Sequence, residues 1–332
     1  MNSSYILFFT MTIISTMITI SSNNWLGMWM GLEMNLMSFI PLISKSKNMK
    51  SSQAMMIYFL TQSIGSIILL LAVLMSSMIT ISPMIYNNLA SILIIMSLLL
   101  KMGAAPFHMW FPEMMSKMNW KECYLLSTWQ KVAPMIVMNN IYSNNWIIYT
   151  AIILSTMIGA VGGLNQTSLR KIMAYSSINH MGWMIAMLSM KTLWWKYLLM
   201  YSIIVLMTMI YFNHNNMYFI NQVMLMSSSM TEKLVYITLL MSMGGLPPFL
   251  GFLPKLLTMQ MMMSTELIMI LTLMCMFSLI TLFYYLRMMS SMILAYSTMN
   301  KWMMYQPTNM MLMYSMLFIN MMLPLMSVLN FF

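Results

Sequence analysis

Apolar segments about as long as a bilayer is thick recur along the whole chain. A helix needs about 20 apolar residues to cross the hydrocarbon core of a membrane, and such stretches follow one another from Tyr5 to Leu329. Of the 332 residues, 61% are hydrophobic and only 6% are charged, whereas ordinary globular chains carry about 25% charge. No long segment is polar enough for a soluble domain, so the sequence predicts an all-α, polytopic membrane protein with a single transmembrane domain over residues 1–332.

Eleven membrane spans are predicted from these segments. In chain order they are Tyr5–Ile20, Trp25–Ile43, Ala54–Met75, Met84–Met109, Cys123–Ile141, Trp146–Leu164, Ile172–Met190, Leu193–Phe212, Leu234–Met263, Leu267–Met288 and Met310–Leu329. The ninth contains the glycine- and proline-rich run Gly244–Lys255, and neither of its halves is long enough to cross alone. Counting the halves separately would give twelve spans. A broken helix is tolerated at membrane depth where its freed backbone groups face protein or water, so eleven is preferred.

Basic residues favour one side of the membrane. Connections after even-numbered spans hold or adjoin Lys45, Lys47, Lys50, Lys117, Lys121, Arg170, Lys171, Lys233, Arg287 and Lys301. Connections after odd-numbered spans hold or adjoin only Lys191 and Lys196. Because lysine and arginine are enriched on the inner side of a membrane, the N-terminus is expected on the matrix or cytoplasmic side. An odd number of spans then places the C-terminus on the opposite side.

Composition also excludes several classes of site. The net charge of +10 does not indicate nucleic-acid binding, because the 15 basic residues are spread thinly at the ends of apolar segments. Cys123 and Cys275 form no paired spacing, so neither a disulfide framework nor a metal site is expected. No motif for haem, an iron–sulfur cluster or a nucleotide is present, so no cofactor is expected on this chain. The 56 methionines fill apolar space and suggest an organellar genetic code.

Two proline-containing runs form an internal repeat. Gly103–Pro112 aligns without gaps on Gly245–Pro254, with a glycine, two prolines and a phenylalanine matching in place. The runs interrupt the fourth and the ninth predicted spans, so an odd separation inverts the second copy in the bilayer. Paired interruptions in inverted halves indicate the transport path of a transporter. Two inverted five-helix repeats are therefore expected at residues 5–141 and 146–288, followed by a final helix at 310–329.

Four charged residues lie inside the predicted spans and not at their ends. Glu33 is near the middle of the second span, Lys101 precedes the first break, Lys131 is mid-way along the fifth span, and Lys255 follows the second break. A lone charge at mid-bilayer costs about 2.5–3.5 kcal/mol on insertion scales, and a typical protein is stable by only about 5–15 kcal/mol. Pairing or hydration of these groups is therefore expected, and each is a candidate functional residue.

The chemistry of these four residues suits proton transfer. Burial disfavours the charged forms of lysine and glutamate, whereas a nearby carboxylate favours the charged lysine, so their approach and separation would bind and release a proton. Glu33 is predicted to modulate Lys101, Lys131 to be the next relay station, and Lys255 to be the exit-side station. The alternatives are lysines that snorkel to an interface, a free-standing cation/proton antiporter, and a purely structural membrane subunit. An antiporter would need an acidic cation site, which three lysines and one glutamate do not provide.

The remaining ionisable residues carry weaker signals. His180 lies inside the seventh span among polar neighbours, so a relay role and a structural role are equally compatible with the sequence. His108, within the first break, is a weaker relay candidate, and His214 is assigned to a hydrated connection. The glutamates near helix starts or basic neighbours are predicted to be solvated charges: Glu113, Glu122, Glu232 and Glu266.

Five motifs resemble the antiporter-like chain 2 subunits of the membrane arm of mitochondrial NADH-ubiquinone oxidoreductase, or complex I. They are Trp29–Asn35, Leu100–His108, Trp129–Pro134, Gly162–Ser177 and Gly244–Lys255. As a set they are specific, and they extend from residue 29 to residue 255. A lysine at position 255 argues against the similar subunit 4, which has a glutamate there.

This resemblance implies a proton path through Glu33, Lys101, Lys131 and Lys255, the residues that the burial argument selects independently. It also implies the shortened N-terminus of the animal subunits. The expected location is the mitochondrial inner membrane, with the N-terminus on the matrix side and the C-terminus on the intermembrane-space side. Expected partners are subunit 4, subunit 4L, accessory subunits and phospholipid including cardiolipin, with no nucleic acid. NAD, FMN, iron–sulfur clusters and ubiquinone would be bound by other subunits of the complex.

Overall fold

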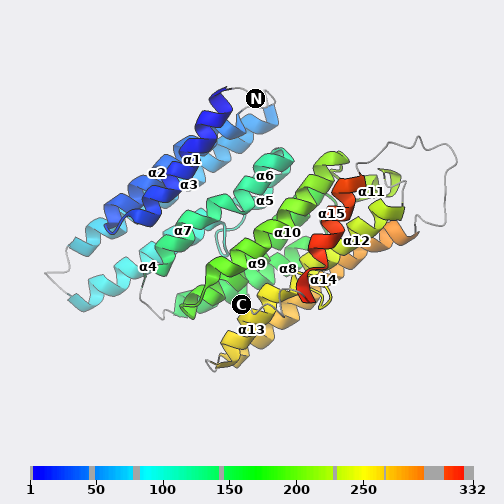
Figure 1. The fold of residues 1–332 in the computed structure, drawn as a ribbon. Helices are drawn as coiled ribbons and strands as arrows, with labels where there is room; N and C mark the ends of the chain where they lie inside the picture. The colour runs from blue at the N-terminus through cyan, green and yellow to red at the C-terminus, as the bar shows by residue number, and fades with distance from the viewer. Residues whose placement is uncertain are drawn as a thin grey trace. The chain divides into compact units, whose positions relative to one another are not determined.

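The chain folds into helices in two compact units, Met1–Ser155 and Thr156–Phe332 (Figure 1). The structure is a computed structural model, and it describes residues 3–44, 49–77, 83–141, 146–226, 230–264, 267–294 and 310–324. These residues form α-helices joined by short connections, and no strand occurs among them beyond an isolated bridge between Ser168 and Phe219. The predicted all-α class is therefore confirmed.

Among its described residues, the first unit contains seven helices and the start of an eighth. They are α1 (Ser3–Ser21), α2 (Trp25–Ile43), α3 (Met49–Ser77), α4 (Pro83–Met102), α5 (Trp110–Lys117), α6 (Trp120–Ser127), α7 (Trp129–Asn139) and α8 (Trp146–Gly163), which continues into the second unit. Within this unit α1 packs along α2, α3 packs against α2, α4 and α5, and α7 contacts α1, α2 and α4. Residues far apart in the sequence are thereby brought around α3 and α7.

Close packing of α1 on α2 depends on small side chains. A Cβ atom added to Gly31 of α2 would lie 2.4 Å from the Thr19 Cγ2 atom of α1. The buried hydroxyls of α1 do not need partners on α2, because Ser15 and Thr19 each donate to the carbonyl three residues earlier in their own helix. Small residues that let backbones approach are typical of membrane helix pairs.

The second unit is built around a nearly completely buried helix. Its helices after α8 are α9 (Leu169–Ser189), α10 (Trp194–His214), α11 (Ile220–Met226), α12 (Met230–Gly244), α13 (Phe252–Ser264), α14 (Ile268–Leu294) and α15 (Met310–Asn320). Almost every residue of α9 from Ile172 to Leu188 is buried, and α9 packs against α10, α13 and α14. The helix α12 packs against α10, α14 and α15.

Most predicted spans coincide with observed helices. The span Trp25–Ile43 matches α2 at both ends, and α1, α2, α3, α8, α10 and α14 are each long and apolar enough to cross a membrane. The stretches Leu89–Met102 and Met310–Asn320 are shorter apolar helices. These lengths support a multi-pass membrane protein, whereas the exact count of eleven spans remains a prediction.

Three features differ from the predicted spans. The fifth span is not continuous, because α6 ends at Ser127 and α7 begins at Trp129. The short helix α11 lies in a connection for which no helix was predicted. The last span was predicted to reach Leu329, but α15 ends at Asn320, and residues 325–329 lie outside the described part of the chain.

Gly159→Ala is expected to lower the thermal stability of the protein, because α8 and α9 approach each other too closely there for a side chain. The added Cβ would lie 2.5 Å from the backbone nitrogen of Asn179 and 2.8 Å from its Cα. Backbone atoms cannot rotate away, so the helices must separate, and overpacking of this kind costs about 1–3 kcal/mol. Thermal unfolding in detergent measures the effect. Val161→Ala on the exposed face of α8 is the control, and equal midpoints for both variants would contradict the prediction.

Candidate functional site

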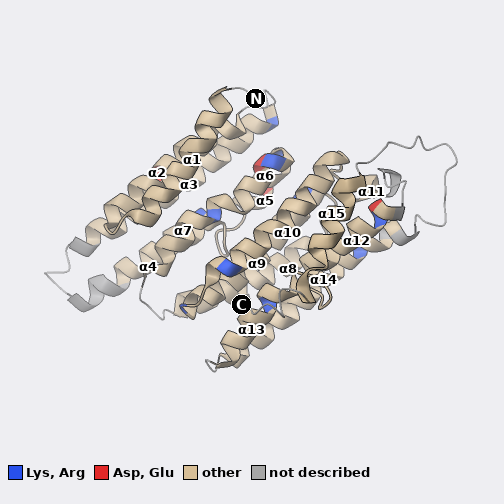
Figure 2. Ribbon diagram, in the orientation of Figure 1, with Lys and Arg blue, Asp and Glu red and all other residues tan. Residues whose placement is uncertain are grey.

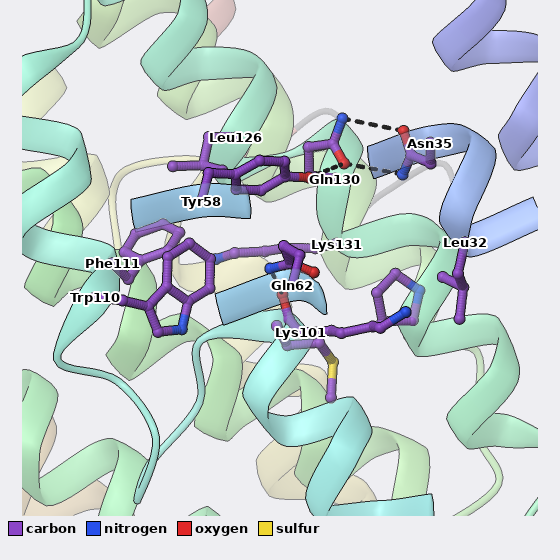
Figure 3. A pocket seen from close by; sticks show the side chains of 12 residues that line it. Leu32, Asn35, Tyr58, Gln62, Lys101, Trp110, Phe111, Leu126, Gln130 and Lys131 are labelled. Carbon is purple, nitrogen blue, oxygen red and sulfur yellow. Dashed lines mark hydrogen bonds between the residues drawn. The ribbon is translucent and has the colours of Figure 1, made fainter. Parts of the chain in front are cut away.

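A small polar cavity lies inside the first unit (Figure 3). It leaves about 20 Å³ for the centre of a water molecule, and a single water needs about 10–15 Å³ by the same measure. Its wall is formed by residues of α2 to α7: Leu32, Asn35, Tyr58, Gln62, Lys101, Met102, Trp110, Phe111, Leu126, Gln130, Lys131 and Pro134. Two of the predicted relay residues, Lys101 and Lys131, thus line the same cavity.

Lys101 lies in the last turn of α4, where the first break begins. Its side chain is 6% exposed and runs past Gly65 of α3, where an added Cβ would lie 3.0 Å from the Lys101 Cγ atom. The last carbonyls of a helix have no partners within it. Here Gln62 Nε2 donates to Lys101 O at 3.1 Å, and Trp110 Nε1 donates to Leu100 O at 3.2 Å. The partial negative charge at this helix end stabilises a lysine there.

Lys131 lies at the start of α7, not in the middle of a continuous span as predicted. The preceding helix α6 ends at Ser127, and the Lys131 backbone N–H donates to Thr128 O at 3.2 Å. The side chain is 2% exposed, and Nζ lies 5.4 Å from the centre of the Phe111 ring. A cation near an aromatic face is stabilised by the ring quadrupole, so the Phe111 ring supports the charged form of Lys131.

Glu33 lies on α2, outside the set of residues that line the cavity. Its charge interacts with Lys101 and with Tyr58. The residue is half-buried, and its Oε1 atom is buried with no hydrogen-bond partner in the described part of the chain. A buried carboxylate oxygen without a partner is costly, and a water molecule or a bound proton would stabilise it.

Four neutral polar residues of this cavity were not selected from the sequence. They are Asn35, Tyr58, Gln62 and Gln130, and the first, second and fourth meet through hydrogen bonds of 2.9 to 3.2 Å. The sequence contained a signal for two of them, because Asn35 follows Glu33 by two residues and Gln130 directly precedes Lys131. Tyr58 and Gln62 are one helical turn apart in an apolar span, which places them on one face of α3.

The two breaks of the internal repeat begin with the same type of helix end. The aligned residues Gly103 and Gly245 both have positive φ, 68° and 75°. After each glycine the next N–H donates back five residues, from Ala104 to Leu99 and from Leu246 to Met241. This left-handed helix end with a six-to-one hydrogen bond is the Schellman motif, which glycine adopts without strain.

Lys255 closes the second break. Its side chain is 3% exposed, and Nζ donates to the carbonyl oxygen of Gly244 at 2.7 Å. Gly244 is the last residue of α12, so a cation here meets the negative end of that half-helix. Nζ also lies 6.0 Å from the centre of the Trp183 ring of α9. The first break uses neutral donors at the corresponding helix end, whereas the second uses this lysine.

His180 lies in the buried helix α9 and is 6% exposed. Its Nδ1 atom is 2.9 Å from the hydroxyl of Tyr197, and its ring centre is 4.8 Å from that of Tyr201. The two weaker candidates are less enclosed, because His108 is half-buried beside the carbonyl of Pro106 and His214 is exposed. Glu33, Lys101 and Lys131 thus belong to the first unit, and Lys255 and His180 belong to the second.

Two glutamates were wrongly predicted to be solvated. Glu122 is 6% exposed and Glu232 is 2% exposed. The Glu122 side chain folds back onto the start of α6, where it accepts hydrogen bonds from the backbone and side chain of Asn119 at 3.2 Å. Glu232 lies in the first turn of α12, and the positive helix end stabilises a carboxylate at such a position. Glu113 is exposed as predicted, and Glu266 lies outside the described residues.

Charged residues are few and scattered over the helices (Figure 2). Among the described residues no three His, Cys, Asp or Glu side chains are grouped closely enough to hold a metal ion.

The chain is similar in sequence to known membrane proteins. Residues 22–281 match the protein family described as NADH:quinone oxidoreductase/Mrp antiporter, transmembrane, so the chain is a membrane subunit of the antiporter type. The chain is 46% identical to NADH-ubiquinone oxidoreductase chain 2 of Aedes aegypti, over 95% of this chain and 94% of the relative. It is 45% identical to that of Anopheles gambiae, over 90% and 88% of the two chains. The chain therefore belongs to the NADH-ubiquinone oxidoreductase chain 2 family.

Solved structures share the fold. A chain of respiratory complex I from Thermus thermophilus with bound aureothin matches with a TM-score of 0.84 and 20% identity, over 98% of this chain and 78% of that chain. A chain of the Mrp complex from Dietzia sp. DQ12-45-1b matches with a TM-score of 0.73 and 15% identity, over 90% and 60% of the two chains. At these identities the likeness concerns the fold alone.

Proposed function

We propose that Glu33, Lys101, Lys131 and Lys255 carry protons through this chain as a subunit of the membrane arm of respiratory complex I. The observation that carries the proposal is the cavity that Lys101 and Lys131 both line, with the charge of Glu33 acting on Lys101. A cavity of this size admits a water, and both lysines in its wall can bind or release a proton. The other residues of its wall are neutral or apolar, so they add no competing charge.

In the proposed sequence of events Glu33 controls the first lysine. When the carboxylate acts closely on Lys101, the ammonium form is favoured, and when that interaction weakens, burial favours release of the proton. Lys131 is the next acceptor because it lines the same cavity and its cationic form is supported by the face of Phe111. The order of titration belongs to the coupled group and not to single residues.

Lys255 is proposed as the exit-side station, with the second break as its support. The carbonyl of Gly244 accepts a hydrogen bond from the Lys255 ammonium and thereby favours the charged lysine. His180 is proposed as an additional relay, because its Nδ1 atom is within hydrogen-bond distance of the Tyr197 hydroxyl. The halves 5–141 and 146–288 are proposed to be inverted repeats, which the shared Schellman geometry at Gly103 and Gly245 supports.

Family membership supports the assignment of partners and location. The chain acts with other subunits of the complex, and we propose subunit 4, subunit 4L and accessory subunits as neighbours, with cardiolipin among the surrounding phospholipids. The proposed location is the mitochondrial inner membrane, with the N-terminus on the matrix side. Binding of NAD, FMN, iron–sulfur clusters and ubiquinone is proposed to reside in other subunits.

Glu33→Gln is the direct test of the proposed proton path. The amide keeps the shape of the side chain but removes the charge that acts on Lys101, so proton translocation is expected to fall by about tenfold or more, a change worth about 1.4 kcal/mol in a transfer step. NADH-driven proton uptake by complex I in sealed vesicles measures it, with assembly on a native gel as the reference. An exposed carboxylate on α5, changed in Glu113→Gln, is the control. Undiminished translocation in assembled Glu33→Gln would favour a purely structural subunit.

A further inference from the structure

We infer that Asn35, Tyr58, Gln62 and Gln130 form a polar frame that positions Glu33, Lys101 and Lys131 relative to one another. The four side chains belong to α2, α3 and α7, and all four line the cavity. They are between 3% and 8% exposed. The inference rests on the proposed proton path, because it assigns these neutral residues the task of holding the proton-carrying groups in place.

The central contact of the polar frame is a reciprocal amide pair between α2 and α7 (Figure 3). Asn35 Nδ2 donates to Gln130 Oε1 at 2.9 Å, and Gln130 Nε2 donates to Asn35 Oδ1 at 3.1 Å. Tyr58 donates its hydroxyl to the same Gln130 Oε1 atom at 3.2 Å. Both lone pairs of that oxygen are then used, so Gln130 cannot turn without losing bonds to two helices.

The helix α3 extends the polar frame to α4. Tyr58 and Gln62 are four residues apart and therefore lie on one face of α3. Tyr58 donates to Gln130 of α7, whereas Gln62 donates to the carbonyl of Lys101 at the end of α4. One face of α3 thus connects the two elements that carry the lysines.

Each contact of the polar frame is made next to a proposed relay residue. Asn35 follows Glu33 by two residues, Gln130 directly precedes Lys131, and Gln62 bonds to the backbone of Lys101 itself. The hydrogen bonds therefore fix the backbone segments from which all three charged side chains extend. Two lysines that line one cavity repel each other when both are charged, and the polar frame resists the separation of α4 and α7 that this repulsion favours.

Packing alone does not account for these residue types. Polar side chains within membrane spans are costly unless they have partners, and leucine or methionine would fill the same space. Neutral amides and a phenol also avoid a new charge beside the lysines. These residues form a reciprocal amide pair, share one acceptor oxygen and cap one helix carbonyl. Such bonds hold the helices in a fixed arrangement, which apolar side chains of the same size would not do.

The test compares loss of the polar frame with its reconstruction. Gln130→Leu removes one partner, and because a misplacement of about 1 Å can cost roughly 100-fold in a transfer step, NADH-driven proton translocation by complex I is expected to fall by at least about tenfold. The double variant Asn35→Gln/Gln130→Asn exchanges the amides and keeps their combined length, so it is expected to restore translocation. Asn35→Leu/Gln130→Leu replaces both partners, which avoids an unpaired amide, and is expected to assemble without restoring translocation.

The three variants separate the possible roles. Normal proton translocation by the assembled Asn35→Leu/Gln130→Leu variant would overturn the polar frame. The polar frame would also be overturned if Asn35→Gln/Gln130→Asn translocated protons no faster than this double leucine variant. If Gln130→Leu fails to assemble, the comparison of these two double variants still tests the polar frame. Unchanged translocation in Glu33→Gln would instead overturn the proposed proton path, so the two failures are distinguishable.

Discussion

Complex I that carries Lys101→Ala in this chain is expected to translocate protons at a rate lower by about 100-fold or more, the range in which a positioned acid or base contributes to a proton transfer. The alanine removes the lysine ammonium, which interacts electrostatically with Glu33. It also removes one of the two lysine side chains that line the cavity. No other ionisable side chain of the described residues lines that cavity except Lys131 and Tyr58. NADH-driven proton uptake in vesicles measures the loss.

Two companion variants show whether the loss comes from Lys101 chemistry or from disrupted folding. Lys50→Ala removes an exposed lysine from α3 and is expected to leave proton uptake unchanged. Lys101→Met keeps most of the apolar length of the side chain, so it is expected to preserve assembly while translocation stays as low as in Lys101→Ala. Near-normal uptake by assembled Lys101→Met would contradict the role of Lys101 as a relay station.

The sequence predicted the charged residues of the site because charge inside an apolar span is rare. Burial confirms that Lys101, Lys131 and Lys255 lie inside the protein, since the cost of a membrane-buried charge selects such positions without knowledge of the fold. The repeat of Gly103 and Gly245 was visible as well, and both glycines have the positive φ that ends a helix. Their roles in proton transfer remain proposals.

The neutral part of the site could not be predicted in the same way. Asn35, Tyr58 and Gln130 have no charge to make them conspicuous, and their partners are 72 or 95 residues away in the sequence. Only the packing of α2, α3 and α7 brings them together. The break at Thr128 is equally hidden, because no glycine or proline marks it and the neighbouring residues favour a continuous apolar helix.

The buried glutamates show a further limit of sequence patterns. Glu122 lies at a helix start among polar residues, which is typical of a solvated carboxylate, yet its two oxygens accept hydrogen bonds from Asn119 and the residue is almost completely enclosed. Position along the chain indicated the helix start correctly. Burial depended on contacts with other elements, which the local sequence does not encode.

Gly245→Ala is expected to reduce proton translocation by about tenfold or more, with the complex still assembled. An added Cβ would lie 2.9 Å from both the Cδ and Nζ atoms of Lys255, so the lysine side chain must shift, which is expected to weaken its hydrogen bond to Gly244. A hydrogen bond to a charged group is worth about 1.5–3 kcal/mol, and alanine at positive φ costs about 1–2 kcal/mol more. NADH-driven proton uptake and a native gel measure function and assembly separately.

The neighbouring glycine provides a matched control for this prediction. At Gly244 the nearest atom to an added Cβ is the Tyr285 Cδ2 atom, at 3.7 Å, so Gly244→Ala is expected to keep both assembly and translocation. The two variants add the same methyl group at adjacent residues, and only one of them displaces the Lys255 ammonium. Equal translocation by Gly245→Ala and Gly244→Ala would contradict the role of Lys255, whereas loss in Gly245→Ala alone would connect proton movement to the position of this lysine at the second break.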